Sequence, residues 1–191
     1  RHLFMFFDKL KIWGKIENLK ILHFAPELQI SEKIRSLNPK EYTMADLFPI
    51  DEKYKKIDVT QIPFENESID IIICNHVLEH VIEYEKALSE IYRVLSINGI
   101  AILQTPYSTL IEKNFEENKI NTDELRLFFY AQEDHVRMFS EKQFFQDLGK
   151  AGFKLKIIKH SDLFNHRDAD YFGVNKKEDL IQVIKSDEKV V

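Results

Sequence analysis

Three histidines carry side chains suited to proton transfer near neutral pH. His76 and His80 lie four positions apart, and His135 lies further along the chain, directly after Asp134. An imidazole with an ordinary pKa of about 6.5 can accept the proton of a hydroxyl group near neutrality. We therefore expect His76, His80 and His135 to be the catalytic candidates.

The segment 132–137 allows two interpretations of His135. In the first, Asp134 orients the imidazole for catalysis. In the second, the segment is a structural turn in which Arg137 pairs with Asp134 or Glu133, and His135 is merely packed. The residues alone leave both open.

A metal site is not expected from these side chains. His76 and His80 could share one side of a helical turn, but Glu79 between them does not complete the H-E-x-x-H spacing of helical zinc sites. Cys74 is the single cysteine of the sequence, so no second thiol exists to build a zinc cluster with it.

Alternating apolar runs and helical stripes indicate the elements that position these residues. Strands are expected over 20–24, 42–45, 56–59, 69–74, 100–104, 153–158 and 180–184. Helices are expected within 1–18, 30–37, 83–95 and 140–151. This alternation predicts one α/β domain over 1–191, with a mostly parallel sheet covered by helices on both faces. The long loop expected over 160–179 would let the last strand return antiparallel.

Polar residues follow three of the predicted strands. Ala25, Pro26 and Glu27 follow the first strand, Asp46 follows the second, and Asn75 follows the fourth. Open parallel sheets bind ligands at this carboxyl edge, and an acid about 20 residues after the first turn is well placed to accept ribose hydroxyls. The alternatives are a solvated cap for Asp46 and, for Glu27, a favourable charge in the first turn of a helix.

Composition excludes several other classes of function. The 191 residues are 44% hydrophobic and 31% charged, which suits a globular domain rather than a disordered chain. With 27 basic and 32 acidic residues, the net charge of −5 offers no general attraction to nucleic acid or to anionic membranes. The lone cysteine fits a reducing compartment and no leader or membrane-spanning run is evident, so we expect a cytoplasmic protein.

Three ordered segments resemble the class I S-adenosylmethionine-dependent methyltransferases. They are 57–64 (IDVTQIPF), 68–81 (SIDIIICNHVLEHV) and 90–95 (EIYRVL), the last followed by Asn98 and Gly99. The resemblance spans about residues 19–158 and implies a Rossmann-like fold with a seven-stranded sheet. The segments 22–27 and 132–137 are similar to a bacterial subgroup often associated with sugar or surface-polymer modification. The resemblance implies methyl transfer to a small-molecule or saccharide acceptor, with oxygen as the expected methylated atom and residues 107–140 as an acceptor-side insertion.

The same resemblance implies roles for individual residues toward S-adenosylmethionine. Asp46 would hold the ribose hydroxyls, and Asp58 would accept a hydrogen bond from the adenine amino group. Asn75 and His76 would line the reactive side. The full set implied to bind the cofactor is Ala25, Pro26, Glu27, Asp46, Leu47, Asp58, Val59, Thr60, Asn75 and His76.

The first turn departs from the family pattern. The family has an acidic residue within the strand and several glycines in the turn, whereas this chain has His23, Ala25, Glu27 and Gln29 at those positions. Glu27 could compensate by pairing with the α-ammonium group of the cofactor.

Two other classes of function compete with this interpretation. A non-catalytic ligand-binding or scaffold domain would keep the fold after losing the glycine turn. A nicotinamide-dependent oxidoreductase would need a glycine fingerprint for the pyrophosphate, which the sequence lacks. The sequence does not indicate an oligomeric state.

Overall fold

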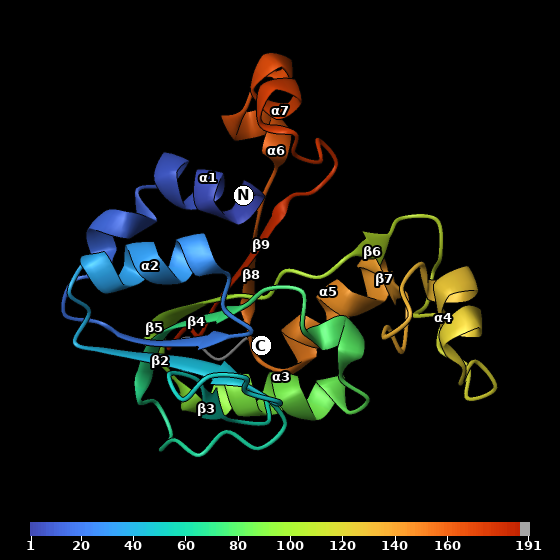
Figure 1. The fold of residues 1–191 in the computed structure, drawn as a ribbon, viewed down its shortest axis with the longest axis horizontal. Coiled ribbons are helices and arrows are strands. Elements are labelled where there is room, and N and C mark those ends of the chain that lie inside the picture. Colours follow the sequence, from blue (N-terminus) through green and yellow to red (C-terminus); the bar gives the residue numbers. More distant parts are fainter. Residues whose placement is uncertain (188–191) are drawn as a thin grey trace.

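The computed structural model describes residues 1–187, with the side chains of all of them except His166. Its centre is a seven-stranded sheet with the strand order β3-β2-β1-β4-β5-β9-β8 (Figure 1). The strands are β1 (Lys20–Phe24), β2 (Glu41–Asp46), β3 (Lys55–Lys56), β4 (Ile69–Cys74), β5 (Leu95–Ile102), β8 (Lys154–Ile158) and β9 (Leu180–Ile184). The first five pair in parallel, and β9 pairs antiparallel with both β5 and β8. The predicted Rossmann-like sheet with an antiparallel last strand is confirmed.

Helices cover both faces of the sheet (Figure 1). One face carries α1 (His2–Lys9), the 3₁₀ helix η1 (Ile12–Lys15) and α2 (Leu28–Ser36), and the other carries α3 (Tyr84–Val94) and α5 (Glu141–Lys150). Successive side chains of β4 point to opposite faces of the sheet. Ile71 and Ile73 belong to the core on the side of α1, η1 and α2, while Ile72 and Cys74 belong to the core on the side of α3 and α5. Each fully buried isoleucine contributes about 1.5–3 kcal/mol.

Two strands, β3 and β5, differ most from the sequence expectation. The strand predicted over 56–59 stops at Lys56, because the carboxylate of Asp58 accepts hydrogen bonds from the backbone N–H and the hydroxyl of Thr60, both at 2.8 Å. This side chain turns the chain away from the sheet. In contrast, β5 begins at Leu95 and continues through Asn98, whose φ is 63°. The expected turn before this strand is therefore a bend within it.

Residues 107–140 form a unit beside the main sheet (Figure 1). In it, β6 (Tyr107–Ser108) pairs in parallel with β7 (Phe139–Ser140), and α4 (Asp123–Tyr130) lies between them in sequence. Ser140 accepts a hydrogen bond from the N–H of Gln143, as predicted for the start of α5, but the Gln143 side chain bonds to Asn114 instead of completing a capping box. The acceptor-side role of this unit stays a prediction.

The segment 160–179 was expected to be a loop, and this expectation was wrong. It contains α6 (His160–Leu163) and α7 (His166–Phe172). Asn165 and Asp168 form a reciprocal capping box at the start of α7, a local signal that the apolar pattern did not reveal. Within the described part of the chain, no helix has both the length and the apolar character needed to cross a membrane.

Candidate functional site

The carboxyl edge of the sheet brings together three predicted site segments. In the register, the last residue of β1 lies opposite Ala45 of β2 and Cys74 of β4. The next positions along the chain, Ala25, Asp46 and Asn75, therefore lie side by side at this edge of the sheet. The N–H of Ala25 donates to the carbonyl oxygen of Ala45 at 2.8 Å.

The turn after β1 bends as a glycine turn does, although it contains no glycine. Ala25 has a φ of 43°, in the left-handed region where a Cβ costs about 1–2 kcal/mol. Pro26 follows, and Glu27 is the N-terminal cap residue of α2. The carboxylate of Glu27 thus stands at the sheet edge.

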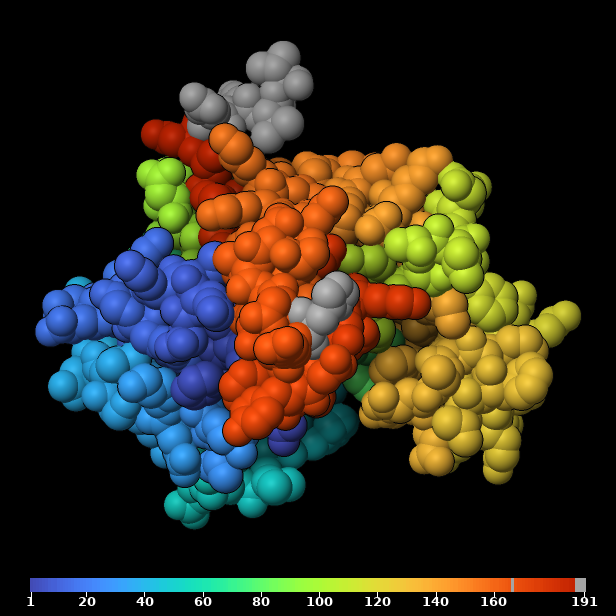
Figure 2. Space-filling view, turned by 90° about the horizontal axis from the view of Figure 1, so that it is seen from above, coloured from blue at the N-terminus to red at the C-terminus, as the bar shows by residue number. Residues whose placement is uncertain are grey.

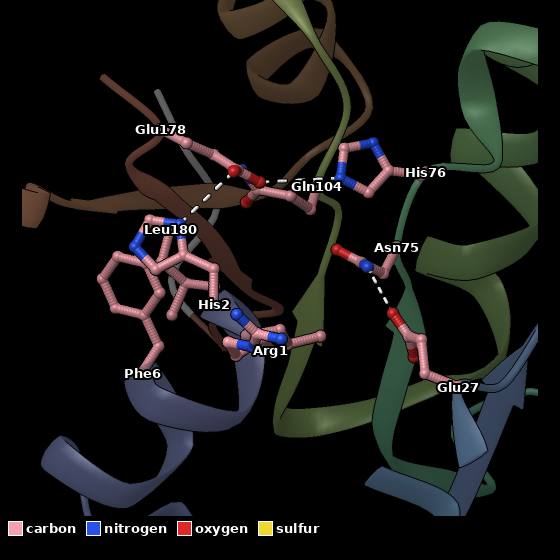
Figure 3. Close-up of a pocket in the computed structure, with 10 residues that line it drawn as sticks. Arg1, His2, Phe6, Glu27, Asn75, His76, Gln104, Glu178 and Leu180 are labelled. Atoms are coloured by element: carbon pink, nitrogen blue, oxygen red, sulfur yellow. Dashed lines mark hydrogen bonds and ion pairs between the residues drawn. The ribbon is translucent and has the colours of Figure 1, made fainter. Parts of the chain in front are cut away.

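Two side chains hold the carboxylate of Glu27. The wholly buried His23 contacts Glu27 Oε2 through Nε2 at 3.1 Å and the hydroxyl of Tyr42 through Nδ1 at 2.9 Å. Asn75 donates to Glu27 Oε1 (Figure 3). Burial lowers the pKa of His23. Burial alone would raise the pKa of Glu27, but its hydrogen bonds to His23 and Asn75 outweigh burial and lower it. A fixed, ionised carboxylate at this position suits a cationic ligand group.

Asp46 and Asp58 each retain a free carboxylate oxygen. Oδ1 of Asp46 accepts a hydrogen bond from the N–H of Phe48 at 2.7 Å. The N–H of Ile57 donates to the carbonyl oxygen of Asp46 at 3.0 Å, and this bond holds the turn at Asp58 next to Asp46. Among the described residues, Oδ2 of neither aspartate has a hydrogen-bond partner. Both oxygens can accept hydrogen bonds from a ligand.

The other predicted adenosine contacts divide by burial. Leu47 is 45% exposed beside Asp46, whereas Val59 and Thr60 are buried. The hydroxyl of Thr60 is already bonded to Asp58. Contact with a ligand from this side would therefore come from Leu47 and the free oxygen of Asp58.

A small cavity of about 170 Å³ lies at the strand edge (Figure 3). Its wall combines the start of α1 with polar residues of the edge, and includes Arg1, His2, Glu27, Asn75, His76 and Glu178. Typical pockets for small-molecule ligands measure roughly 300–1,000 Å³. The cavity can therefore enclose only part of such a ligand.

His76 lies between two carboxylates. Nδ1 is 3.2 Å from Glu79 Oε1, and Nε2 is 3.5 Å from Glu178 Oε1. Hydrogen bonds to Glu178 and Glu79 raise the pKa of His76 to about 10. Burial alone would raise the pKa of Glu178, but its bonds to His2 and His76 lower it to about 2. His76 is therefore a cation at neutral pH and is poorly suited to accept a proton.

A larger cavity of about 800 Å³ adjoins the other side of His76. Its wall includes His80, Tyr107, Tyr130 and His135. Figure 2 shows the hollow between the α6–α7 segment (orange) and the α4 segment (yellow). All three predicted catalytic histidines thus line one cavity.

The rings of His80 and His135 are oriented by acceptors at Nδ1. Nδ1 of His80 lies 3.1 Å from the carbonyl oxygen of Asp134 and 3.2 Å from its carboxylate, and Nδ1 of His135 lies 3.3 Å from the carbonyl oxygen of Tyr130. An acceptor at Nδ1 requires the hydrogen there, which leaves the lone pair of a neutral ring on Nε2. Burial lowers the pKa of His135, which favours its neutral form.

The structure changes the pairing expected around His135. Asp134 contacts His80, so the idea that it orients His135 was wrong. Arg137 pairs with neither Asp134 nor Glu133, because its buried guanidinium donates to Glu116 and to backbone carbonyls of the turn after β4.

Sequence reasoning missed several residues of the two cavity walls, among them Glu178, Gln104 and Glu79. Glu178 and Gln104 meet at the small cavity, where Gln104 Nε2 lies 3.3 Å from Glu178 Oε1. Their positions are 74 residues apart, so no local spacing links them. Glu79 lies inside a recognised segment, but its near-complete burial depends on the fold around it.

Comparisons with known proteins agree with this geometry. Residues 26–103, less than half of the chain, match the sequence model of the methyltransferase domain family. A 75-residue segment is 35% identical to an uncharacterised protein of Methanocaldococcus jannaschii, covering 38% of this chain and 33% of that protein. An 81-residue segment is 32% identical to an uncharacterised methyltransferase-like protein of Schizosaccharomyces pombe, covering 37% and 31%. The chain thus matches about a third of the length of these curated relatives.

Solved structures share the fold. The 1,6-didemethyltoxoflavin-N1-methyltransferase of Burkholderia thailandensis, with its bound substrate and S-adenosylhomocysteine, is similar with a TM-score of 0.61 and 14% identity, over 96% of this chain and 78% of that one. The sheet order and the polar strand edge define a class I methyltransferase fold. The match of residues 26–103 to the methyltransferase domain model agrees with this fold.

S-adenosylmethionine is the cofactor of this class, and the donor set at the strand edge suits it. Glu27 offers a carboxylate for an ammonium group, and Asp46 offers a free oxygen for ribose hydroxyls. The bend at Ala25 keeps the turn open without a glycine. The residues present therefore fit the cofactor, although the small cavity would enclose only its amino-acid portion.

Proposed function

We propose that this chain transfers a methyl group from S-adenosylmethionine to an oxygen atom of a small-molecule or sugar-like acceptor. The observation that carries the proposal is that His76 lines both cavities. The small cavity contains the polar residues suited to the cofactor, and the large one has a volume within the range of small-molecule sites. The two ligands would therefore meet beside His76.

When bound, S-adenosylmethionine supplies a methyl group on an electrophilic sulfonium. The chain itself would act mainly by holding the two ligands in contact, which can contribute roughly 7–11 kcal/mol to lowering a barrier. Glu27 would hold the amino-acid portion, and Asp46 and Asp58 the nucleoside. The cation of His76 would stand between the cavities, too strongly protonated to serve as the base.

The acceptor cavity carries the remaining chemistry. Tyr107 and Tyr130 line it, and Nε2 of His80 and His135 is available to a hydroxyl group of the acceptor. A polar wall with aromatic rings suits a sugar-like molecule. A net charge of −5 argues against nucleic acid as the acceptor.

We also propose that the chain acts in the cytoplasm. Its single cysteine, Cys74, is fully buried and unpaired, which fits a reducing compartment.

Calorimetric titration with S-adenosylmethionine tests the proposal. We expect binding by the wild-type chain, and thermal stabilisation of about 2.7 kcal/mol at a hundredfold excess over the dissociation constant. Asp46→Asn should weaken binding at least about tenfold, since it removes a charge-assisted hydrogen bond. The matched variant Asp8→Asn, which changes an exposed aspartate on α1, should bind as the wild type does. Absence of binding at millimolar cofactor would instead favour a scaffold domain.

A further inference from the structure

Glu79, His80 and His135 form a cluster in the wall of the larger cavity whose chemistry goes beyond proton transfer. A carboxylate oxygen of Glu79 and one ring nitrogen of each histidine lie within 4.8 Å of one another. Two imidazoles and one carboxylate are the protein ligands of catalytic zinc sites that keep one coordination position open. We propose that these three side chains bind a first-row divalent metal ion, best matched by Zn²⁺, with its open position toward the acceptor.

The two histidines are oriented as metal ligands usually are. A ligating histidine commonly donates its second N–H to a carboxylate or carbonyl oxygen, which fixes the tautomer and the ring. His80 and His135 both show this arrangement at Nδ1, with Asp134 and Tyr130 as the acceptors. Among the described residues, no hydrogen bond occupies Nε2 of either ring. Both Nε2 atoms are therefore available to an ion.

Each carboxylate oxygen of Glu79 has one neighbouring partner and can still accept a second one. Oε1 lies 3.2 Å from His76 Nδ1, and Oε2 accepts from the hydroxyl of Thr105 at 3.0 Å. A carboxylate oxygen has a second lone pair and can also ligate a metal. Glu79 is only 1% exposed, so a bound ion would balance its buried charge.

The two segments that supply the ligands are tied together by the backbone. The N–H of Val136 donates to the carbonyl oxygen of Glu79 at 3.0 Å. The buried Arg137 donates to the carbonyl oxygens of Leu78 at 3.1 Å and Ile82 at 2.7 Å. The turn after β4 and the segment 134–137 therefore hold a fixed relative position before any ion binds.

The separations require a modest contraction. In a tetrahedral site with bonds of about 2.0–2.2 Å, ligand atoms lie roughly 3.3–3.6 Å apart. The three ligand atoms lie up to 4.8 Å apart here, which exceeds the tetrahedral separation by at most about 1.5 Å. Rotation of the side chains can close this difference. Imidazole ligands favour Zn²⁺ and similar ions over Mg²⁺ or Ca²⁺.

The proposed site differs from the sequence expectation that no metal binds. That expectation considered spacing within one helical turn, whereas the third ligand, His135, comes from a separate segment. An open coordination position in the acceptor cavity favours an acceptor that presents a hydroxyl oxygen. This statement about the acceptor rests on the function proposed above. His80 and His135 would then hold the ion instead of accepting a proton. The ion would lower the pKa of the bound hydroxyl group, so that its proton is lost to solvent before the oxygen is methylated.

Titration of the chelator-treated chain with ZnCl₂ tests the site without cofactor or acceptor, so its outcome is independent of the proposed methyl transfer. We expect one ion per chain with a dissociation constant near or below about 1 μM. Glu79→Gln, His80→Gln and His135→Gln should each weaken binding at least about 100-fold, more than the loss of an outer-shell partner would. Glu133→Gln and Glu124→Gln, which change exposed residues outside the cluster, serve as matched controls and should bind within about threefold of the wild type.

Two results would overturn the site: no binding by the wild-type chain, or equal affinity in the cluster variants and the controls. Circular dichroism melting establishes whether each variant is folded. Should the cluster variants not fold, Co²⁺ added to the wild-type chain still decides. Intense visible absorption of a four-coordinate ion supports the site, and the weak spectrum of hydrated Co²⁺ refutes it.

Discussion

At the scale of single residues, the edge of the sheet still presents a carboxylate although the first turn departs from the family pattern. The acid that the family carries inside the first strand is replaced by His23, which cannot itself accept a hydrogen bond from an ammonium group while its Nε2 faces Glu27. The buried imidazole instead orients Glu27 at the mouth of the strand. The carboxylate thus stands at position 27 instead of position 23, and the predicted partner of the cofactor's ammonium group is still a carboxylate.

The bend at Ala25 gives a prediction of stability. Its φ of 43° costs an alanine about 1–2 kcal/mol, which exceeds the roughly 0.5–1 kcal/mol of chain entropy that a glycine adds. We expect Ala25→Gly to raise the free energy of unfolding in urea by about 0.5–1 kcal/mol. Ala87→Gly, inside α3 and fully buried, should lower it by at least about 1 kcal/mol. A loss of stability in Ala25→Gly would show that the bend is unstrained.

At the scale of elements, the sequence identified those with a repeating apolar pattern. The strands β1 and β4 are dense apolar runs, and α3 and α5 carry clear stripes, so their positions follow from burial. The helices α4, α6 and α7 lie in segments rich in polar and aromatic residues, where no apolar stripe predicted a helix. Side-chain caps at Thr122 and Asn165 mark the starts of α4 and α7, whereas α6 has no such cap. The carboxyl edge was predicted because parallel strands bring their ends together. The walls supplied by α1 and by Glu178 depend on contacts between distant segments and were not predictable.

Arg137 joins the 107–140 unit to the main domain, which predicts a large cost for its loss. Its guanidinium is 1% exposed, bonds to Glu116 at 3.0 Å, and lies over the ring of Tyr84 at 4.6 Å. Arg137→Met would leave buried carbonyl groups without donors, and we expect a loss of about 3–5 kcal/mol in urea denaturation. Arg137→Lys should lower the free energy of unfolding by less, since lysine keeps the positive charge although it lacks the planar set of guanidinium donors.

The control for this prediction is Lys142→Met, which removes an exposed ion pair with Glu112 and should change stability by less than about 1 kcal/mol. If Arg137→Met and Lys142→Met proved equally stable, Arg137 would not connect the two parts of the molecule.

At the scale of the whole molecule, Glu178 joins parts of the chain that lie far apart in sequence. It contacts His2 of α1 at 3.3 Å, His76 after β4 at 3.5 Å, and Gln104 after β5 at 3.3 Å. The N-terminal helix is thereby held against the sheet edge at the small cavity. Closure of that cavity and stability of the fold should therefore depend on the ionisation of this one carboxylate.

The pKa of Glu178 gives this dependence a direction. Its pKa is about 2 in the folded chain, against an ordinary value of 4.5, so its contribution to stability is present above about pH 4.5 and is lost as the pH falls toward 2. The full shift would correspond to about 3 kcal/mol, which we reduce to about 1–2 kcal/mol because His76 is half-exposed. We expect Glu178→Gln to be less stable than the wild type by this amount at pH 6, and the difference to shrink steadily toward pH 3. Urea denaturation across this range measures it, with the exposed Glu52→Gln as the matched control. A difference that stays constant with pH would mean that packing of Glu178, rather than its charge, holds α1 in place.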